Sequence, residues 1–366
     1  MKVIAQTAAL QEALNLASSI VAIRTPKPVL QCVKLVAKGK KLTLLATDLE
    51  AACRYDVSQV EVQKEGETLV PVAKFADIVR ESAGDETMTI SGEKDSCEIA
   101  VAGARFKLLT FDPAEYPAVA DFDDSGDFQI SSEALALLVE RTLFAVARAH
   151  SHYAISGVLW ETSGKKLQLV ATDGHRLALA KTNLAKAAAK DVSAIVPAKL
   201  MNLLQRVATG SEETLSVKVV DAQIMIRTAR AVLMSTLVQG NFPKYNDVVP
   251  HECVRKATLD AQTFSHRLRQ AALLTNEESK GVRISFTSGE ATLTSRAPEQ
   301  GEAEVKVPVK FTGEPLEIAF NPVFLTDALK VVRSEEVVME FSAGNKPALI
   351  KSGSDFLYVV MPVDLG

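Results

Sequence analysis

The sequence predicts an α+β fold made of three copies of one domain, because the chain repeats itself both in short segments and in the order of its elements. Residues 39–48 read GKKLTLLATD, and residues 164–173, which lie 125 positions further along, read GKKLQLVATD. A fainter third copy places ATLTSRAPE at residues 291–299. One third of the 366-residue length is close to this offset. We therefore expect domains at residues 1–122, 123–250 and 251–366.

Each copy has the same order of elements. A helix with apolar residues at 3.6-residue spacing comes first, with Thr7, Ser131 or Asp260 as its N-cap, and a second helix follows after short alternating strands. The predicted helices cover residues 7–19, 73–83, 131–149, 198–207, 260–274 and 321–333. The clearest strands cover residues 33–37, 41–46, 87–91, 97–101, 105–110, 157–161 and 166–171. Two helices per copy must bury their apolar stripes on one face of a mostly antiparallel sheet.

Composition excludes several classes of protein. With 47% apolar and 23% charged residues, the chain can bury a large core and is neither disordered nor fibrous. The four cysteines lie too far apart for a C-x-x-C pair or a zinc site, so we expect reduced thiols in a cytoplasmic protein. They are Cys32, Cys53, Cys97 and Cys253. No apolar run is long enough to span a bilayer or to form a signal peptide, so we expect no membrane association.

Positive charge is concentrated on the predicted helices. The net charge of −4 argues against a protein that coats nucleic acid over its whole surface. The six helical segments nevertheless hold ten Lys or Arg against seven Asp or Glu, which leaves −7 on the rest of the chain. Lys199 and Arg206 are seven positions apart and share one helical stripe, as do Arg141 and Arg148. Composition alone does not separate a solvated helix face from one that meets phosphates.

The most unusual polar run lies at residues 172–177, TDGHRL. Its ordinary interpretation is a strand end followed by an Asp-Gly turn. The first copy has TDLE at residues 47–50 and the third has RAPE at residues 296–299, so the middle copy alone combines glycine, histidine and arginine there. This difference favours a binding function added to the middle repeat. No phosphate-binding loop, metal motif or nucleophile elbow is present.

The C-terminus is a second candidate surface. Pro362 has no amide hydrogen to donate, so the last strand should end there. The apolar residues Pro362, Val363 and Leu365 then have no following sequence to cover them. Exposed apolar surface beside a polar turn is typical of a groove that binds peptides.

Taken together, these segments resemble the bacterial DNA polymerase III beta subunits, the sliding clamps. The matching motifs are ATDLE at 46–50, ATDGHRL at 171–177, GNFPKY at 240–245, TNE at 275–277 with GVR at 281–283, and VVMP at 359–362. The resemblance implies a head-to-tail homodimer that forms a closed ring around duplex DNA, with helices lining the hole. It also implies a processivity factor with no catalytic activity, cofactor or metal. The implied partners are duplex DNA of any sequence, DNA polymerase III subunits, the clamp loader, and other proteins that carry a short peptide with a glutamine and apolar side chains.

The resemblance also assigns a pocket for that peptide, between the middle and third domains. The pocket residues are Ile155, Thr172, Gly174, His175, Arg176, Leu177, Pro243, Val248, Asn321, Phe324, Val360, Met361 and Pro362. Asp247 and Asp364 stand where the family commonly has arginine, and Gly366 extends the tail. The preferred peptide sequence therefore stays open.

Two further sets of residues are assigned. Arg24 and Tyr153 are expected to touch DNA by resemblance, and Lys199 and Arg206 are expected to do so from their shared helical stripe. The dimer edge is expected to place Phe106 and Leu108 of one chain against Leu273 and Leu274 of the other. The ordinary interpretation of these four apolar residues is that they belong to the core.

An enzyme is the alternative hypothesis. A hydrolase or transferase built from triplicated domains would use His175 and Asp173 as its catalytic pair. Loss of turnover in a His175→Ala variant would favour this alternative over a clamp.

Overall fold

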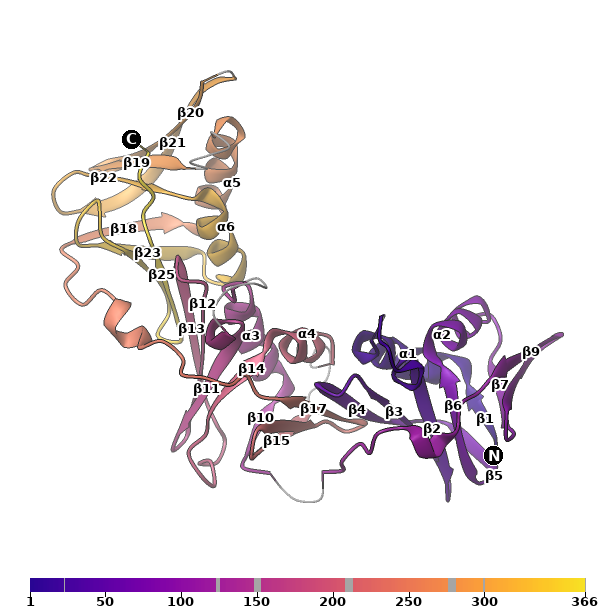
Figure 1. Ribbon diagram of the computed structural model, residues 1–366. Helices are drawn as coiled ribbons and strands as arrows, with labels where there is room; N and C mark the ends of the chain where they lie inside the picture. The colour runs from indigo at the N-terminus through magenta and orange to yellow at the C-terminus, as the bar shows by residue number, and fades with distance from the viewer. Residues whose placement is uncertain are drawn as a thin grey trace. The chain divides into compact units, whose positions relative to one another are not determined.

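The computed structural model describes residues 1–22, 24–122, 126–147, 153–207, 213–275, 281–298 and 300–365, and of Tyr153 it describes the backbone alone. The chain forms two compact units. Unit one contains residues 1–133 and 202–237, and unit two contains residues 134–201 and 238–366. Figure 1 shows the elements of both units.

All six predicted helices are present, and all lie close to the predicted positions. They are α1 (Thr7–Ile20), α2 (Val72–Glu81), α3 (Ser132–Leu143), α4 (Ala198–Val207), α5 (Ala261–Ala271) and α6 (Pro322–Val331). Their apolar stripes are buried as expected: α5, for example, buries Phe264 and Leu268 completely. Burying a side chain of this size contributes roughly 2–3 kcal/mol.

The strands form three antiparallel sheets. Unit one contains a five-stranded sheet with the order β5 (Val60–Lys64), β1 (Lys2–Gln6), β7 (Thr87–Gly92), β8 (Ser96–Val101) and β9 (Ala104–Leu109). It also contains an eight-stranded sheet with the order β10 (Phe128–Ser131), β15 (Thr214–Val220), β16 (Gln223–Arg227), β17 (Ala231–Thr236), β4 (Ala51–Val57), β3 (Lys41–Thr47), β2 (Cys32–Lys38) and β6 (Gly66–Pro71).

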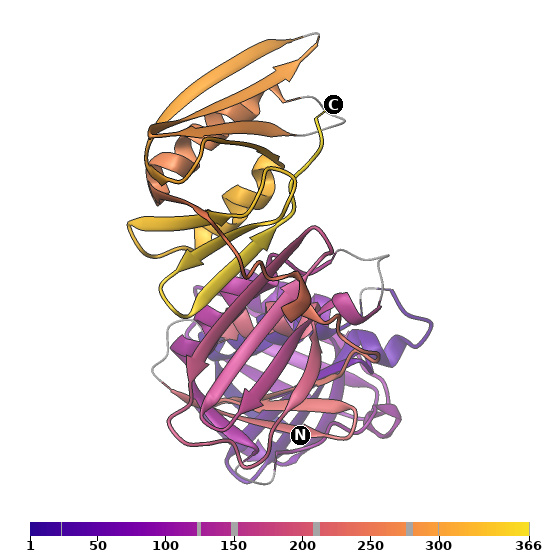
Figure 2. The ribbon, with the colours of Figure 1, turned by 90° about the vertical axis from the view of Figure 1, so that its left-hand side faces the viewer.

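Unit two contains a twelve-stranded sheet. Its order is β14 (Ser193–Pro197), β11 (Gly157–Ser163), β12 (Lys166–Thr172), β13 (Arg176–Asn183), β25 (Phe356–Val360), β24 (Ala348–Ser352), β23 (Glu336–Phe341), β18 (Arg255–Asp260), β21 (Gly301–Thr312), β20 (Gly289–Ala297), β19 (Val282–Thr287) and β22 (Leu316–Phe320). Within this unit, α5 and α6 lie side by side along the strands of the third repeat (Figures 1 and 2).

The predicted α+β fold with three repeats is confirmed. In each repeat a short strand leads straight into the first helix (β1 to α1, β10 to α3, β18 to α5), and another leads into the second (β6 to α2, β14 to α4, β22 to α6). The sequence did not predict that two sheets continue from one repeat into the next. β17 pairs with β4, and β13 pairs with β25.

Four helix ends differ from the prediction by two residues or more, and the first is that of the helix predicted at 73–83, which ends at Glu81. The helix predicted at 131–149 ends at Leu143, and residues 148–149 lie outside the described residues. The helix predicted at 260–274 ends at Ala271, and a 3-10 turn, η5 (Ala272–Leu274), follows it. The helix predicted at 321–333 ends at Val331 because Val332 is already extended.

Of the predicted N-caps, Asp260 is confirmed and Thr7 is wrong. Asp260 caps α5, because its carboxylate accepts a hydrogen bond from the Thr263 amide at 2.7 Å. Thr7 does not cap α1: it is the first helical residue, and its buried hydroxyl makes no hydrogen bond. Gln6 occupies the cap position without a side-chain bond, because the chain enters α1 directly from β1. Ser131 directly precedes α3.

The four cysteines are free thiols, three buried and Cys253 half-buried. Burial raises the pKa values of Cys32, Cys53 and Cys97 to about 12, so these thiols keep their protons at neutral pH. Among the residues that the structure describes, no helix is both long and apolar enough to cross a membrane.

Candidate functional site

The polar run at residues 172–177 forms a tight turn between β12 and β13. The Asp173 carboxylate oxygen Oδ1 accepts hydrogen bonds from the backbone amides of His175 and Arg176, both at 3.0 Å. The Thr172 hydroxyl donates to the Arg176 carbonyl at 2.7 Å and accepts from the Gly174 amide at 3.1 Å. Gly174 has φ +89°, a left-handed conformation that glycine adopts without strain. The predicted Asp-Gly turn is therefore confirmed.

The first repeat contains the same turn between β3 and β4. The Asp48 carboxylate accepts from the amides of Glu50 at 3.1 Å and Ala51 at 2.7 Å, as Asp173 does in the middle repeat. Leu49 takes the place of glycine, has φ +79° and leaves 56% of its side chain exposed. The turn geometry is thus a feature of the repeat. The residues after the aspartate distinguish the middle copy, where Gly174, His175 and Arg176 replace Leu49, Glu50 and Ala51.

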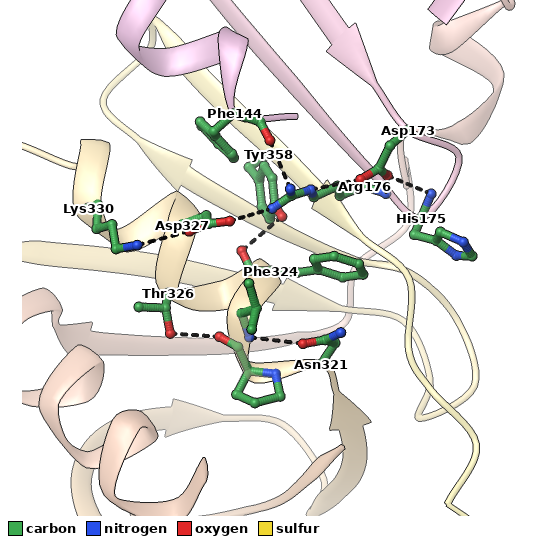
Figure 3. A network of polar contacts seen from close by, with 12 residues as sticks. Phe144, Asp173, His175, Arg176, Asn321, Phe324, Thr326, Asp327, Lys330 and Tyr358 are labelled. Carbon is green, nitrogen blue, oxygen red and sulfur yellow. Dashed lines mark hydrogen bonds and ion pairs between the residues drawn. The ribbon is translucent and has the colours of Figure 1, made fainter. Parts of the chain in front are cut away.

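Arg176 joins this turn to α6 and to the end of α3 (Figure 3). Its Nε donates to Asp173 Oδ2 at 3.0 Å, and its Nη1 donates to Asp327 Oδ2 on α6 at 2.9 Å. Its Nη2 donates to the Phe144 carbonyl at 2.8 Å. The guanidinium also lies 4.6 Å from the centre of the Phe324 ring, a cation–π contact.

The electrostatics keep Arg176 charged. Burial alone would lower its pKa, but the hydrogen bond to Asp327 and the charge of Asp173 outweigh burial and raise it. Tyr358 lies beside this network, and burial raises the pKa of its phenol, which donates to the Phe324 carbonyl at 2.9 Å. With its side chain only 9% exposed, Arg176 holds segments together and does not reach into solvent.

The solvent side of the network carries apolar groups from three segments. His175 is exposed and its ring lies nearly parallel to that of Phe324, with centroids 6.2 Å apart and an interplanar angle of 19° (Figure 3). The Met361 amide donates to the His175 carbonyl at 2.9 Å, and 41% of the Met361 side chain is exposed. Val323, at the start of α6, is 55% exposed.

A second apolar layer begins at Leu177, which points to the opposite face of the sheet from Arg176. Leu177 belongs to a buried cluster with Leu159, Val170, Ile195, Leu349 and Val359. The segment at residues 238–249, which we call the connector, packs Phe242, Tyr245 and Val249 on this cluster. The connector ends in a 3-10 turn, η4 (Tyr245–Val248). Val248 is 49% exposed and Pro243 is exposed.

The predicted pocket residues thus fall into four groups. His175, Phe324 and Met361 meet at the surface, and Leu177 lies with the connector that carries Pro243 and Val248. Thr172, Gly174, Arg176 and Asn321 have structural roles: the Asn321 side chain caps α6 by accepting from the Val323 amide at 3.0 Å. Ile155 and Val360 are buried, and Pro362 is half-buried.

The C-terminal tail is more covered than the sequence predicted. The Val363 amide donates to the Ala319 carbonyl at 2.9 Å. Leu365 and Val363 lie directly against the backbone of Gly281, where even a methyl group would collide with them. The prediction that the tail has nothing to cover it is wrong, because Gly281 of the third repeat lies against it; Figure 2 shows the tail leaving β25 along that repeat.

Sequence reasoning missed several residues of the site. Asp327, Phe144 and Tyr358 bind or surround Arg176, but they lie 151, 32 and 182 positions away from it. No local pattern marks them. Tyr245 stood out only as the last residue of the GNFPKY motif, although it anchors the connector.

The geometry does not suit the enzyme alternative. A catalytic pair would need the Asp173 carboxylate to orient the His175 imidazole. Both Asp173 oxygens instead accept from Arg176 and from two backbone amides, while the imidazole lies against Phe324.

The residues assigned to DNA are placed as follows. Arg24 is exposed shortly after α1, and Lys199 and Arg206 both lie on α4. Arg206 Nη1 donates to the Ser19 hydroxyl of α1 at 2.8 Å. The Tyr153 side chain lies outside the described residues.

Arg141 contradicts the predicted basic stripe. It is buried and forms an ion pair with Asp355 at 2.7 Å. Spacing predicted a shared stripe for Arg141 and Arg148, but spacing alone does not determine which side of the helix faces solvent. Arg148 lies outside the described residues.

Three arginines also gather on the last repeat, beside the acidic residues Asp260 and Glu335. α5 and α6 border a hollow of about 840 Å³ whose lining includes Arg267, Arg269 and Arg333. The narrow buried stripe of α5, formed by Ala261, Phe264, Leu268 and Ala271, leaves the rest of its circumference to such side chains.

The residues assigned to the dimer edge are largely exposed. β9 is the last strand of its sheet, with Phe106 36% exposed and Leu108 half-buried. Leu109, which was not predicted, is 79% exposed. Leu273 is 77% exposed and Leu274 is half-buried. The core interpretation is therefore wrong for Phe106 and Leu273.

Comparison with known proteins covers nearly the whole chain. Three family models match in order: the N-terminal domain of the DNA polymerase III beta subunit over residues 1–120, its central domain over 129–244 and its C-terminal domain over 246–364. The beta sliding clamp of Pseudomonas aeruginosa is 33% identical over 362 residues, which is 98% of this chain and 99% of that protein.

Two further matches agree with this one. The beta sliding clamp of Chlamydia muridarum is 34% identical over 350 residues, 95% of this chain and 94% of that protein. The crystal structure of a Pseudomonas aeruginosa sliding clamp bound to griselimycin matches with a TM-score of 0.95 and 33% identity over the full length of both chains.

Proposed function

Because the chain belongs to the family of bacterial DNA polymerase III beta subunits, the sliding clamps, we propose that two copies join head to tail into a closed ring around duplex DNA. The chain is a processivity clamp for DNA polymerase. The observation that carries the proposal is that all three domains of the family occur in order along it. The ring acts by topology and carries out no catalysis, so it needs no cofactor, and its place of action is the cytoplasm, where the chromosome is copied.

The domain boundaries near residues 122 and 250 are part of this proposal. The acidic stretch that begins at Asp121 and the proline-containing stretch before His251 fit linkers between repeats. The matched family domains end at residues 120 and 244, which supports the same division.

Two edge surfaces of the chain suit each other as the head-to-tail interface. β9 has neighbours on one side only, and it presents exposed Arg105 and Lys107 beside Phe106. Within the part of the chain that the structure describes, residues 301–309 of β21 pair with β20 alone, since β18 pairs with residues 310–312. That free stretch carries exposed Glu302 and Glu304. Strand pairing between unlike edges with opposite charges would join one copy to the next.

The basic helix residues are proposed to face the DNA. Arg24, Tyr153, Lys199 and Arg206 form the proposed contact set, and the hollow lined by Arg267, Arg269 and Arg333 extends it to the third repeat. Contacts to phosphates read no base sequence, so they are compatible with sliding.

Salt dependence tests this assignment. In the double variant Lys199→Ala/Arg206→Ala, we expect the slope of log K against log salt for duplex binding to fall by about 0.9 for each phosphate that the variant no longer neutralises. The matched control is Arg283→Ala, which removes an exposed arginine on β19 that pairs with Glu317 at 2.8 Å. An unchanged slope in the double variant would show that Lys199 and Arg206 do not contact the DNA.

The surface around His175, Phe324, Met361 and Val248 is the proposed peptide-binding site. It offers apolar groups from three segments above a rigid, hydrogen-bonded base formed by Arg176. Apolar anchors would supply most of the binding energy, and backbone groups would fix the register. DNA polymerase III subunits, the clamp loader and other partners would bind through short segments with a glutamine and two or three large apolar side chains.

Peptide affinity tests this site. We expect Met361→Ala to weaken binding of such a fluorescent peptide about tenfold, because it removes apolar surface that the peptide would cover. Removing residues 362–366 should weaken it as well. Val254→Ala is the matched control, since Val254 is 73% exposed and lies outside the proposed site. Equal affinity of Met361→Ala and the wild type would refute the assignment.

A further inference from the structure

Three polar side chains form a closed set of hydrogen bonds on the sheet face that the connector crosses. Glu161 on β11 and Gln168 on β12 are direct partners in the antiparallel register. The Gln168 side-chain amide donates to the Tyr245 hydroxyl at 2.7 Å and to Glu161 Oε2 at 3.3 Å. The Tyr245 hydroxyl donates to Glu161 Oε2, also at 2.7 Å. The Tyr245 hydroxyl is thus bound to two neighbouring strands of the sheet.

The environment of Tyr245 keeps this arrangement intact at neutral pH. Its ring packs on the buried cluster that contains Leu177, and it meets the Phe242 ring edge-on at 6.4 Å between centroids. Burial, with a smaller effect of Glu161, raises the pKa of the phenol to about 12. The hydroxyl therefore keeps the proton that it donates.

Tyr245 lies in the same 3-10 turn as a residue of the proposed peptide site. It is the first residue of η4, and Val248, a residue of the proposed peptide site, is the last. Pro243 lies two residues before it. The turn spans only four residues, and the Asp247 amide closes it by donating to the Lys244 carbonyl at 3.1 Å, so a tyrosine fixed at one end restricts the direction of Val248 at the other.

We propose that Glu161, Gln168 and Tyr245 form a latch that positions the connector for peptide binding. This inference rests on the proposed peptide site. None of the three needs to touch the peptide: they act through Pro243 and Val248, which lie on either side of Tyr245 in the connector. The connector itself packs on the Leu177 cluster through Phe242, Tyr245 and Val249. When the latch is open, the connector samples other positions, and only a fraction of the molecules can accept a peptide.

The test is Tyr245→Phe, which removes the hydroxyl and keeps the ring. We expect the Kd for the peptide to rise fivefold to tenfold, mostly through a lower association rate constant, because the competent fraction falls while the groups that touch the peptide are unchanged. Glu161→Ala should have a similar effect. Glu161→Gln keeps an acceptor for the phenol and should bind nearly as the wild type does.

Tyr116→Phe is the matched control. The Tyr116 hydroxyl is also buried and doubly bonded, to the Thr47 amide at 3.0 Å and the Cys32 carbonyl at 3.2 Å, but it lies in unit one. We expect its loss to lower thermal stability and to leave the peptide Kd unchanged. If a general loss of stability caused the effect, the peptide Kd would change equally in Tyr245→Phe and Tyr116→Phe.

A second readout needs no peptide. Lys244 is exposed directly before Tyr245, so trypsin should cleave after Lys244 several times faster in Tyr245→Phe than in the wild type or Tyr116→Phe. Unchanged cleavage would overturn the latch, whatever the peptide does. Faster cleavage with an unchanged peptide Kd, while Met361→Ala weakens binding, would also overturn it. If Met361→Ala leaves binding unchanged, the proposed peptide site is wrong, and cleavage still decides whether the latch exists.

Discussion

Replacing Arg176 with alanine is expected to destabilise unit two by about 3 kcal/mol. The substitution removes three hydrogen bonds and leaves the carboxylates of Asp173 and Asp327 without their guanidinium. Losing one member of a buried ion pair costs about 3–5 kcal/mol. Since the two aspartates are 18% and 21% exposed, water compensates part of the loss, and the lower end of that range applies.

Urea unfolding of the full chain measures this effect. Arg176→Lys should recover only a small part of the stability, because an ammonium group cannot reproduce the planar fork that reaches Asp173, Asp327 and the Phe144 carbonyl together. Arg283→Ala is the control: its pair with Glu317 is 42% and 57% exposed, so its loss should cost less than about 1 kcal/mol. If Arg176→Ala unfolds within error of Arg283→Ala, the guanidinium does not hold the turn to α6.

The second large effect is expected on the proposed dimer, at the edge that carries Leu273. Leu273→Asp should convert the dimer to monomers at micromolar concentration by raising the dissociation constant at least 100-fold, about 2.7 kcal/mol. Leu273 is 77% exposed in the single chain and would be buried in the ring, where a carboxylate loses its hydration without gaining a partner. A few residues near the centre of an interface carry most of its binding energy, so a charge buried there has a large effect.

Sedimentation equilibrium distinguishes the outcomes. The wild type should have a mass near twice 39.4 kDa, and Leu273→Asp should approach 39.4 kDa. Val254→Asp is the matched control, because Val254 is 73% exposed and belongs to neither proposed edge. A dimer that survives Leu273→Asp, or that Val254→Asp breaks equally, would contradict the proposed interface.

Much of the fold was predictable because its determinants are local. Apolar periodicity located every helix, and the repeat of GKKLTLLATD as GKKLQLVATD marked the same strand pair in two copies. Cap geometry was less predictable: Asp260 caps α5, but Thr7 was drawn into α1 because β1 continues directly into the helix. The continuity of sheets across repeats depends on pairing between distant edges, and no local pattern encodes it.

The turn at residues 172–177 was predictable, but the roles of its residues and their distant partners were not. Comparison among the three repeats marked the turn at residues 172–177, and in the structure its residues have separate roles. Arg176 has a structural role, because it binds partners on α6 and directly after α3. His175 lies at the surface beside Phe324. Arg141 shows the same limit: helical spacing placed it on a stripe, and its buried pair with Asp355 depends on a residue 214 positions away.

We propose that this chain holds DNA by encircling it. The most direct measurement is retention of the protein on duplex DNA after clamp loading, compared between a closed circle and the same circle cut once. We expect long retention on the circle, at salt that abolishes ordinary binding, and rapid loss once the DNA is cut, because a ring slides off free ends. Equal retention on circular and linear DNA would contradict it.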